Sequence, residues 1–172
     1  MTAVVKDARP PTAVVRVLNP VLCSLLRSPV GRLIGPLALI EFTGRRSNKT
    51  YRVVVAWHDL LDTPIVLTPA PWRANFTTGA SVTVRWRGRR ANYFAVLDTD
   101  PDNVATAMNT MLANGTSARG LALHIPTGHH VNRDDVIATR RALIRFQPTN
   151  RAGHEANPPT TGDRPEIQCH GT

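Results

Sequence analysis

The residues best suited to binding an anion lie in the segment 43–52, which reads T-G-R-R-S-N-K-T-Y-R. Guanidinium and ammonium groups form strong, directional bonds to phosphate, and a turn with Gly and Asn can aim several backbone N–H groups at one anion. The segment predicts a phosphate site on a hairpin loop, and a solvated basic hairpin is the alternative. The candidate binding residues are Arg45, Arg46, Ser47, Lys49 and Arg52.

A second candidate is the segment 69–75, P-A-P-W-R-A-N, which follows an apolar run. Trp72 and Asn75 stand three residues apart, so a flat aromatic ring and an amide share one side of a helical turn. Such a pair could cover a planar heterocycle. The alternative is a loop tryptophan that fills the mouth of a barrel.

Three histidines, His124, His129 and His130, lie close together near residue 130. No cysteine or carboxylate stands at the spacing of a metal-ligand set, so the sequence predicts no metal site. The histidines are interpreted as loop residues, with a proton donor in a substrate pocket as the alternative.

Length and charge limit the function classes. The chain has 172 residues, 21 Lys and Arg against 12 Asp and Glu, and a net charge of +9. A surface of this charge favours polyanions, acidic lipids or a phosphorylated ligand, although the arginine excess also fits the codon bias of a GC-rich genome. Cys23 and Cys169 are too few for a disulfide framework, so we expect a cytoplasmic protein.

The ends of the chain differ from its middle. Residues 1–36 predict basic amphipathic helices, which either pack on their own domain or make a peripheral membrane contact. Their longest apolar stretch, 17–26, is too short to span a bilayer, and no signal-peptide pattern precedes it. Residues 37–148 predict the folded domain, and residues 149–172 a disordered tail.

The middle of the chain predicts an α+β fold that is mainly β. Period-two apolar runs bounded by Gly, Pro or Asp indicate strands, and their short spacing favours a six-stranded antiparallel split barrel over a parallel sheet. The strands are expected at 37–43, 51–57, 65–68, 81–87, 91–97 and 142–147. A helix should begin at Asp100-Pro101 and end at Asn114-Gly115. Asn132 and Asp135 could cap a further short helix.

Both motifs together carry a family resemblance. A strand that ends in T-G-R-R-S, a strand that opens with Arg52, and then Trp72-x-x-Asn75 resemble the deazaflavin-dependent nitroreductase family. These are split β-barrel proteins, largely actinobacterial and distantly similar to pyridoxamine-phosphate-oxidase-like flavoproteins. The resemblance covers about residues 19–114 and the last strand. The chain departs from the family at Arg46, usually Lys, and at Asn48, usually Gly.

The resemblance implies an oxidoreductase that uses coenzyme F-420, with FMN as the alternative cofactor. Arg45, Arg46 and Ser47 match the positions that bind the cofactor's phosphate, and Arg52 matches the arginine that opens the next strand. Trp72 and Asn75 match the segment beside the deazaflavin ring. Trp57, together with His129 and His130, is expected on the side of the acceptor, a quinone or nitroaromatic. No catalytic acid or base is demanded.

The sequence is also compatible with functions other than an oxidoreductase. The same fold could serve as a cofactor carrier or pseudoenzyme, and as a monomer or a homodimer. The segment 85–90, R-W-R-G-R-R, could bind single-stranded nucleic acid, because basic barrels with aromatic platforms do so. The favoured interpretation of this segment is a solvated hairpin, with Arg85 and Arg87 facing water and Val82, Val84 and Trp86 facing inward.

Overall fold

The structure is a computed structural model that describes residues 5–7 and 36–149. Most of the expected N-terminal helical segment, and the tail from residue 150, lie outside the described residues. Within residues 5–7 the expectation of helix is wrong, because Lys6–Asp7 form a short strand, β1. β1 pairs antiparallel with β8, Leu123–His124.

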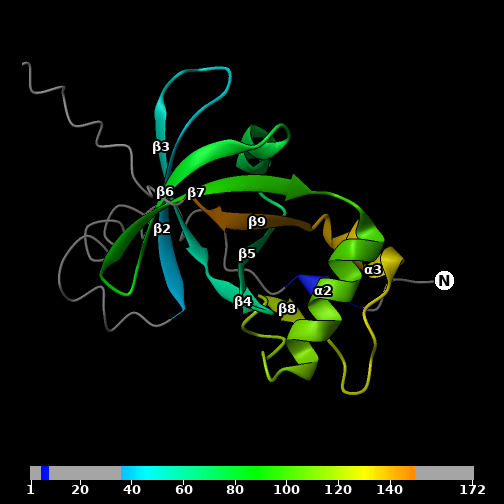
Figure 1. The fold of residues 1–172 in the computed structure, drawn as a ribbon. Helices are drawn as coiled ribbons and strands as arrows, with labels where there is room; N and C mark the ends of the chain where they lie inside the picture. Colours follow the sequence, from blue (N-terminus) through cyan, green and yellow to red (C-terminus); the bar gives the residue numbers. More distant parts are fainter. Residues whose placement is uncertain (1–4, 8–35, 150–172) are drawn as a thin grey trace, which may run out of the picture.

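Seven antiparallel strands form the main sheet, in the order β3-β2-β6-β7-β9-β5-β4 (Figure 1). All six strands expected from the sequence are found within two residues at each end, and β5 and β7 each begin two residues early. The strands are β2 Leu37–Thr43, β3 Thr50–Ala56, β4 His58–Leu60, β5 Thr63–Thr68, β6 Ala80–Trp86, β7 Arg89–Asp98 and β9 Ala142–Pro148.

The expected count of six strands is wrong by one, and the extra strand explains how the sheet curls. β3 and β4 are opposite edges of the sheet, yet only Trp57 separates the end of one from the start of the other. The two edges must therefore meet at Trp57, which bends the sheet into a half-barrel. β4 then turns into β5 through Leu61 and Asp62, whose φ angles of 49° and 64° form a tight two-residue turn.

Two helices follow β7 as expected. α2, Pro101–Ala113, begins with a proline at its first turn, and the Asp100 side chain accepts a hydrogen bond from the backbone N–H of Asp102. α3, Arg133–Thr139, begins with a capping box between Asn132 and Asp135. A two-turn 3-10 helix, η2 Pro71–Phe76, precedes β6.

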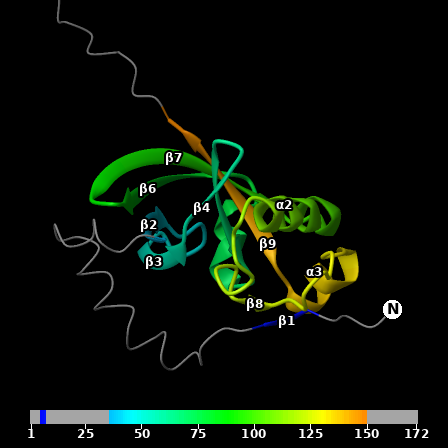
Figure 2. The same ribbon diagram turned by 90° about the horizontal axis from the view of Figure 1, so that it is seen from below.

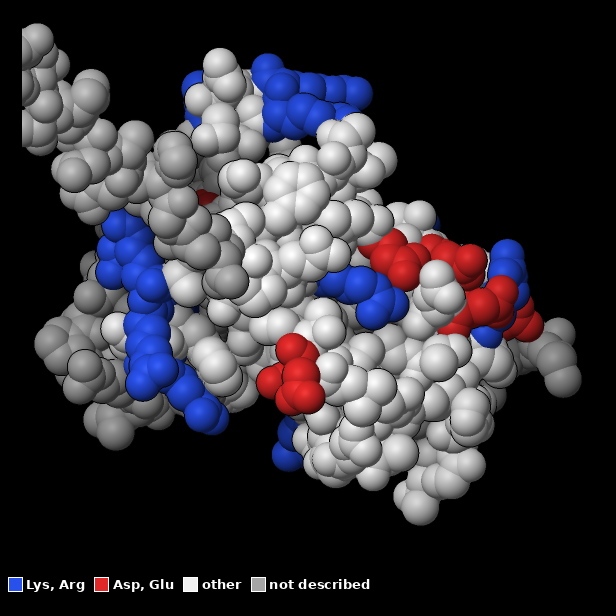
Figure 3. All heavy atoms as spheres, viewed as in Figure 1, with Lys and Arg blue, Asp and Glu red and all other residues white. Residues whose placement is uncertain are grey.

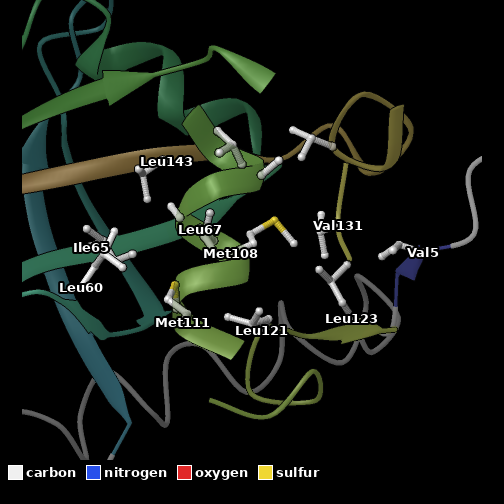
Figure 4. Close-up of a cluster of buried hydrophobic side chains, with 14 residues drawn as sticks. Val5, Leu60, Ile65, Leu67, Met108, Met111, Leu121, Leu123, Val131 and Leu143 are labelled. Atoms are coloured by element: carbon white, nitrogen blue, oxygen red, sulfur yellow. The ribbon is translucent and has the colours of Figure 1, made fainter. Parts of the chain in front are cut away.

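Two hydrophobic cores lie on opposite sides of β5 and β9. Val66, Ile144 and Phe146 face the inside of the barrel, while Ile65, Leu67 and Leu143 face α2. Alternate residues of one strand point to opposite faces, so 65–67 of β5 and 142–144 of β9 are continuous apolar runs. Figure 4 shows the second core, where Met108 and Met111 of α2 meet Leu121, Leu123 and Val5.

The cap of α2 gives a stability prediction. We expect Asp100→Ala to lower the free energy of unfolding by about 1 kcal/mol, because the Asp102 N–H loses its acceptor. Asp100→Asn keeps an acceptor and should stay close to wild type. Urea unfolding of the three proteins compares them, and equal midpoints for Asp100→Ala and wild type would contradict the role of the cap.

Candidate functional site

The connection between β2 and β3 is a hairpin, as the sequence predicts. The backbone N–H of Gly44 donates to Lys49 O at 2.8 Å, and Asn48 N–H donates to Gly44 O at 2.9 Å. Asn48 has a φ of 55°, in the left-handed region that Asn tolerates better than most residues. The residues from Arg45 to Lys49 are all exposed. The two backbone hydrogen bonds therefore fix the turn, and the side chains of Arg45, Arg46 and Lys49 are exposed to solvent.

The structure joins the two candidate segments through Asn75. Its Oδ1 accepts a hydrogen bond from the Arg45 backbone N–H at 2.9 Å, and its Nδ2 donates to Trp72 O at 2.7 Å. Thirty residues separate Asn75 from Arg45 along the chain. One amide thus fixes the hairpin against η2 and uses both its acceptor and one of its donors in doing so.

The cations near this junction are of two kinds. Within the described residues, Arg45, Arg46 and Lys49 form no ion pair with a carboxylate. Arg52 differs, because its Nε lies 2.8 Å from Glu41 Oε2 on the neighbouring strand. Among the described residues, no carboxylate therefore balances the charge of the hairpin loop, whereas Arg52 is paired with Glu41.

Aromatic rings continue the site from the hairpin to η2. The half-buried Trp72 ring lies 6.0 Å from the rings of both Phe42 and Phe76, and Phe42 stacks on Tyr51 at 5.6 Å. The Ser47 and Tyr51 hydroxyls are 3.1 Å apart. A flat ring could lie against Trp72 while an anionic group reaches the hairpin.

A polar hollow of about 540 Å³ opens at the base of the same hairpin, between Thr43 and Thr50. Strands β2, β6 and β7 supply most of its wall, and Arg90 is its exposed cation. Its lining residues are Glu41, Phe42, Thr43, Thr50, Ser81, Val82, Thr83, Arg90, Asn92 and Thr149.

Trp57 lies away from the β2–β3 hairpin. It follows the end of β3 that is distant from the hairpin, and the five steps along the strand from Tyr51 to Ala56 span about 17 Å. The ring is 5% exposed and packs against Phe146, Tyr93 and Trp86, with centroids at 4.8, 5.7 and 6.1 Å. The structure therefore places Trp57 in the barrel core, with Trp86 and Tyr93 beside it.

The histidines lie at the other end of the molecule, beside α2 and α3. His129 Nε2 is 2.7 Å from Asp135 Oδ2, and His130 Nδ1 is 3.0 Å from the side-chain amide of Asn109. Figures 1 and 2 both separate these helices from the β2–β3 hairpin. The structure does not bring His129 and His130 to Trp57 or to the hairpin. Among the described residues, no three His, Cys, Asp or Glu side chains gather in a group that could hold a metal ion.

Two ionisable residues were not singled out from the sequence. Glu41, with a side chain 14% exposed, binds Arg52 and lies 3.7 Å from Arg85. Only strand register could have revealed this contact, because the partners are cross-strand neighbours. His58 of β4 is partly buried, and this burial, with the nearby Arg141 charge, lowers the pKa of the imidazole below 6.5. His58 is therefore a neutral structural side chain at neutral pH.

Positive charge gathers in two separate patches (Figure 3). One covers the β2–β3 hairpin and the other follows the β6–β7 hairpin. In the second, the cross-strand pair Arg85 and Arg90 lies on one face, and the pair Trp86 and Arg89 on the other. The four arginines of 85–90 thus do not share one surface with the tryptophan. The inward placement of Val82, Val84 and Trp86 is confirmed.

Comparisons with known proteins leave the family open. No protein-family model and no curated protein matches the chain. Solved structures that are similar include protein Atu2129, of unknown function, from Agrobacterium tumefaciens, at 17% identity and a TM-score of 0.44 over 86% of this chain. This chain covers 59% of the Agrobacterium protein's length.

Two further structures are similar at lower identity. A candidate pyridoxamine 5'-phosphate oxidase from Listeria innocua has 9% identity and a TM-score of 0.41, over 70% of this chain and 89% of its own. HutZ, the heme storage protein of Vibrio cholerae, has 13% identity and a TM-score of 0.40, over 70% and 86%. At these values none of them assigns a ligand or an activity to this chain. No helix in the described residues has the length and apolar character needed to cross a bilayer.

Proposed function

We propose that the protein binds coenzyme F-420 at the junction of the β2–β3 hairpin and η2, and that it transfers hydride from the reduced cofactor to a small planar acceptor such as a quinone or nitroaromatic. The observation that carries the proposal is the hydrogen bond from Arg45 N–H to Asn75 Oδ1. It joins the cationic loop to the segment with the flat indole, so an anion and a ring could be held by one site.

The donor set of this junction fits a cofactor that is a planar ring with an anionic arm. Arg45, Arg46 and Lys49 supply charge that no carboxylate neutralises within the described residues. Ser47 adds a hydroxyl, and Trp72 adds an aromatic surface. Arg52 contributes differently from the expectation, because its pairing with Glu41 makes it a support for β3 rather than a free ligand for phosphate.

The bound deazaflavin would supply the hydride donor, since such cofactors carry the redox chemistry themselves. The chain's own residues would bind the phosphate, hold the ring against Trp72 and shape the approach of the acceptor. No side chain at the junction needs to move a proton. His129 and His130 take no part, because they lie beside α2 and α3, away from this junction.

The proposal predicts that Arg46→Ala weakens F-420 binding about tenfold or more, since one charge-assisted bond contributes about 1.5–3 kcal/mol. Titration of the cofactor's fluorescence measures the affinity. Arg119→Ala is the matched control, because Arg119 is an exposed arginine in the turn after α2 and its loss changes net charge equally.

The outcomes separate the alternatives. Equal affinity for Arg46→Ala and wild type, or no binding by either, would refute the cofactor site. Tighter binding of FMN than of F-420 would assign the site to a flavin. Binding that is never followed by reoxidation of reduced F-420, over a panel of quinones and nitro compounds, would make the protein a carrier instead of an oxidoreductase.

A further inference from the structure

Arg73 of η2 makes two contacts that the proposed cofactor site does not use. Its Nη1 donates to the backbone oxygen of Thr68 at 3.2 Å and also to the backbone oxygen of Arg140. Thr68 is the last residue of β5, and Arg140 follows the last residue of α3, two residues before β9 begins. One guanidinium nitrogen thus connects η2 to the end of a strand and the end of a helix.

The two backbone oxygens belong to neighbouring parts of the domain. β5 and β9 lie side by side in the sheet (Figure 1), with Thr68 opposite Ala142. Arg140 has a φ of 51°, the left-handed conformation that commonly ends a helix. The last carbonyls of a helix have no partner within it, and a basic side chain can hydrogen-bond to them. Arg73 therefore supplies a donor where α3 ends and β9 is about to begin.

The position of η2 depends on such contacts more than that of a longer α-helix would. A 3-10 helix has poorer hydrogen-bond geometry than an α-helix. Residues three apart share one side of it, so Trp72 and Asn75 point one way and Arg73 points another. Asn75 fixes η2 to the hairpin through Arg45 N–H. Arg73 fixes it to β5 and α3, and the two contacts together set the rotation of η2 about its axis.

The Trp72 ring takes its place from this rotation. It is half-buried and lies 6.0 Å from Phe42 of β2 at an interplanar angle of 37°. It meets Phe76 at the same distance, edge-on, and Phe76 is a fully buried residue of η2 itself. A rotation of η2 would carry Trp72 away from Phe42, because the two rings stand on different elements.

We propose that Arg73 is a positioning residue that fixes the rotation of η2 and so holds the Trp72 ring at the angle at which a cofactor ring stacks on it. Arg73 acts through Trp72 and does not touch the cofactor. An arginine suits this role, because its planar guanidinium loses less freedom per hydrogen bond than the flexible lysine does. The ligand part of the inference rests on the proposed F-420 site, whereas the placement of Trp72 is a property of the chain alone.

A double-variant cycle tests whether Arg73 acts through Trp72. We expect Arg73→Ala to weaken F-420 binding about three- to tenfold, the range for one lost aromatic contact. In a Trp72→Ala background it should change the affinity by less than about twofold. Arg140→Ala is the matched control, because it removes the same charge and keeps the backbone oxygen that Arg73 binds. Equal losses by Arg73→Ala with and without Trp72 would overturn the proposal.

A deazariboflavin that lacks the phosphate arm separates the ring from the anion. Arg73→Ala should weaken the binding of this ligand and of F-420 by the same factor, since both would stack the same ring on Trp72. Arg46→Ala should weaken only F-420. A loss by Arg73→Ala that is confined to F-420 would mean that Arg73 binds the anionic arm directly, and the positioning role would be refuted.

The indole N–H resonances of the free protein report on the placement without any cofactor. We expect Arg73→Ala to shift the resonance of Trp72, Arg73→Lys to shift it less, and Arg140→Ala to leave it in place. The resonance of Trp57, in the barrel core, should stay unchanged in all three variants. An unmoved Trp72 resonance, or an equal shift of Trp57, would overturn the proposal. A shift of Trp72 alone, in a protein that binds no F-420, would support the positioning role and refute the cofactor site.

Discussion

Asn75→Asp is expected to weaken F-420 binding about a hundredfold, more than the loss of any single hairpin cation. The carboxylate would stand where Oδ1 now accepts from Arg45 N–H at 2.9 Å. Two negative charges about 6 Å apart repel by about 3 kcal/mol at an effective dielectric constant of 20, which is about a hundredfold in affinity. The substitution also loses the donor to Trp72 O.

Asn75→Ala separates the two causes. It removes both hydrogen bonds and adds no charge, whereas aspartate keeps the acceptor for Arg45 N–H. Weaker binding by the aspartate variant than by the alanine variant is therefore a lower limit for the repulsion. That difference should shrink as ionic strength rises, because salt screens exposed charges. Cofactor fluorescence titrations at low and high salt provide the measurement. If the two variants bind equally at low salt, Asn75 does not adjoin the bound anion.

The strands were predictable because their local pattern agrees with their packing. Ile65, Val66 and Leu67 form a continuous apolar run, and the structure buries β5 on both faces. β4 could not be predicted because its three residues, His58, Asp59 and Leu60, include only one apolar residue and so show no strand-like alternation. Its pairing comes from the turn at Leu61 and Asp62, and of these two only Asp62 is of a residue type that is enriched in left-handed backbone.

Of the candidate site, only the hairpin was predictable from local sequence. The hairpin could be placed because Gly44 and Asn48 lie between two apolar runs. The contact between Arg45 and Asn75 could not be derived from spacing, since it depends on how η2 folds back over the loop. The pairing of Arg52 with Glu41 and the burial of Trp57 also follow from strand register and barrel closure. Neither the ion pair nor the burial of Trp57 can be recognised from the residues that neighbour them in the sequence.

Asp135→Ala is expected to cost about 2–4 kcal/mol of unfolding free energy, because buried donors without an acceptor cost about 1–3 kcal/mol each and a lost helix cap about 1. Asp135 is 1% exposed. Its Oδ2 accepts from Asn132 N–H at 3.1 Å and binds His129 at 2.7 Å, and its Oδ1 accepts from Val5 N–H at 3.3 Å.

Asp135→Asn should fall between alanine and wild type. An amide offers one oxygen and one NH₂ group, so whichever way it turns, a donor faces either Val5 N–H or the pair on Oδ2. His129→Ala should cost less, because its side chain is 21% exposed and water can replace it. Denaturant unfolding ranks the four proteins, and amide exchange at Leu123 reports whether β1 leaves β8 before the whole domain unfolds. An Asp135→Ala protein as stable as His129→Ala would mean that the carboxylate serves only the histidine, and that the N-terminal strand is held by its ladder with β8 alone.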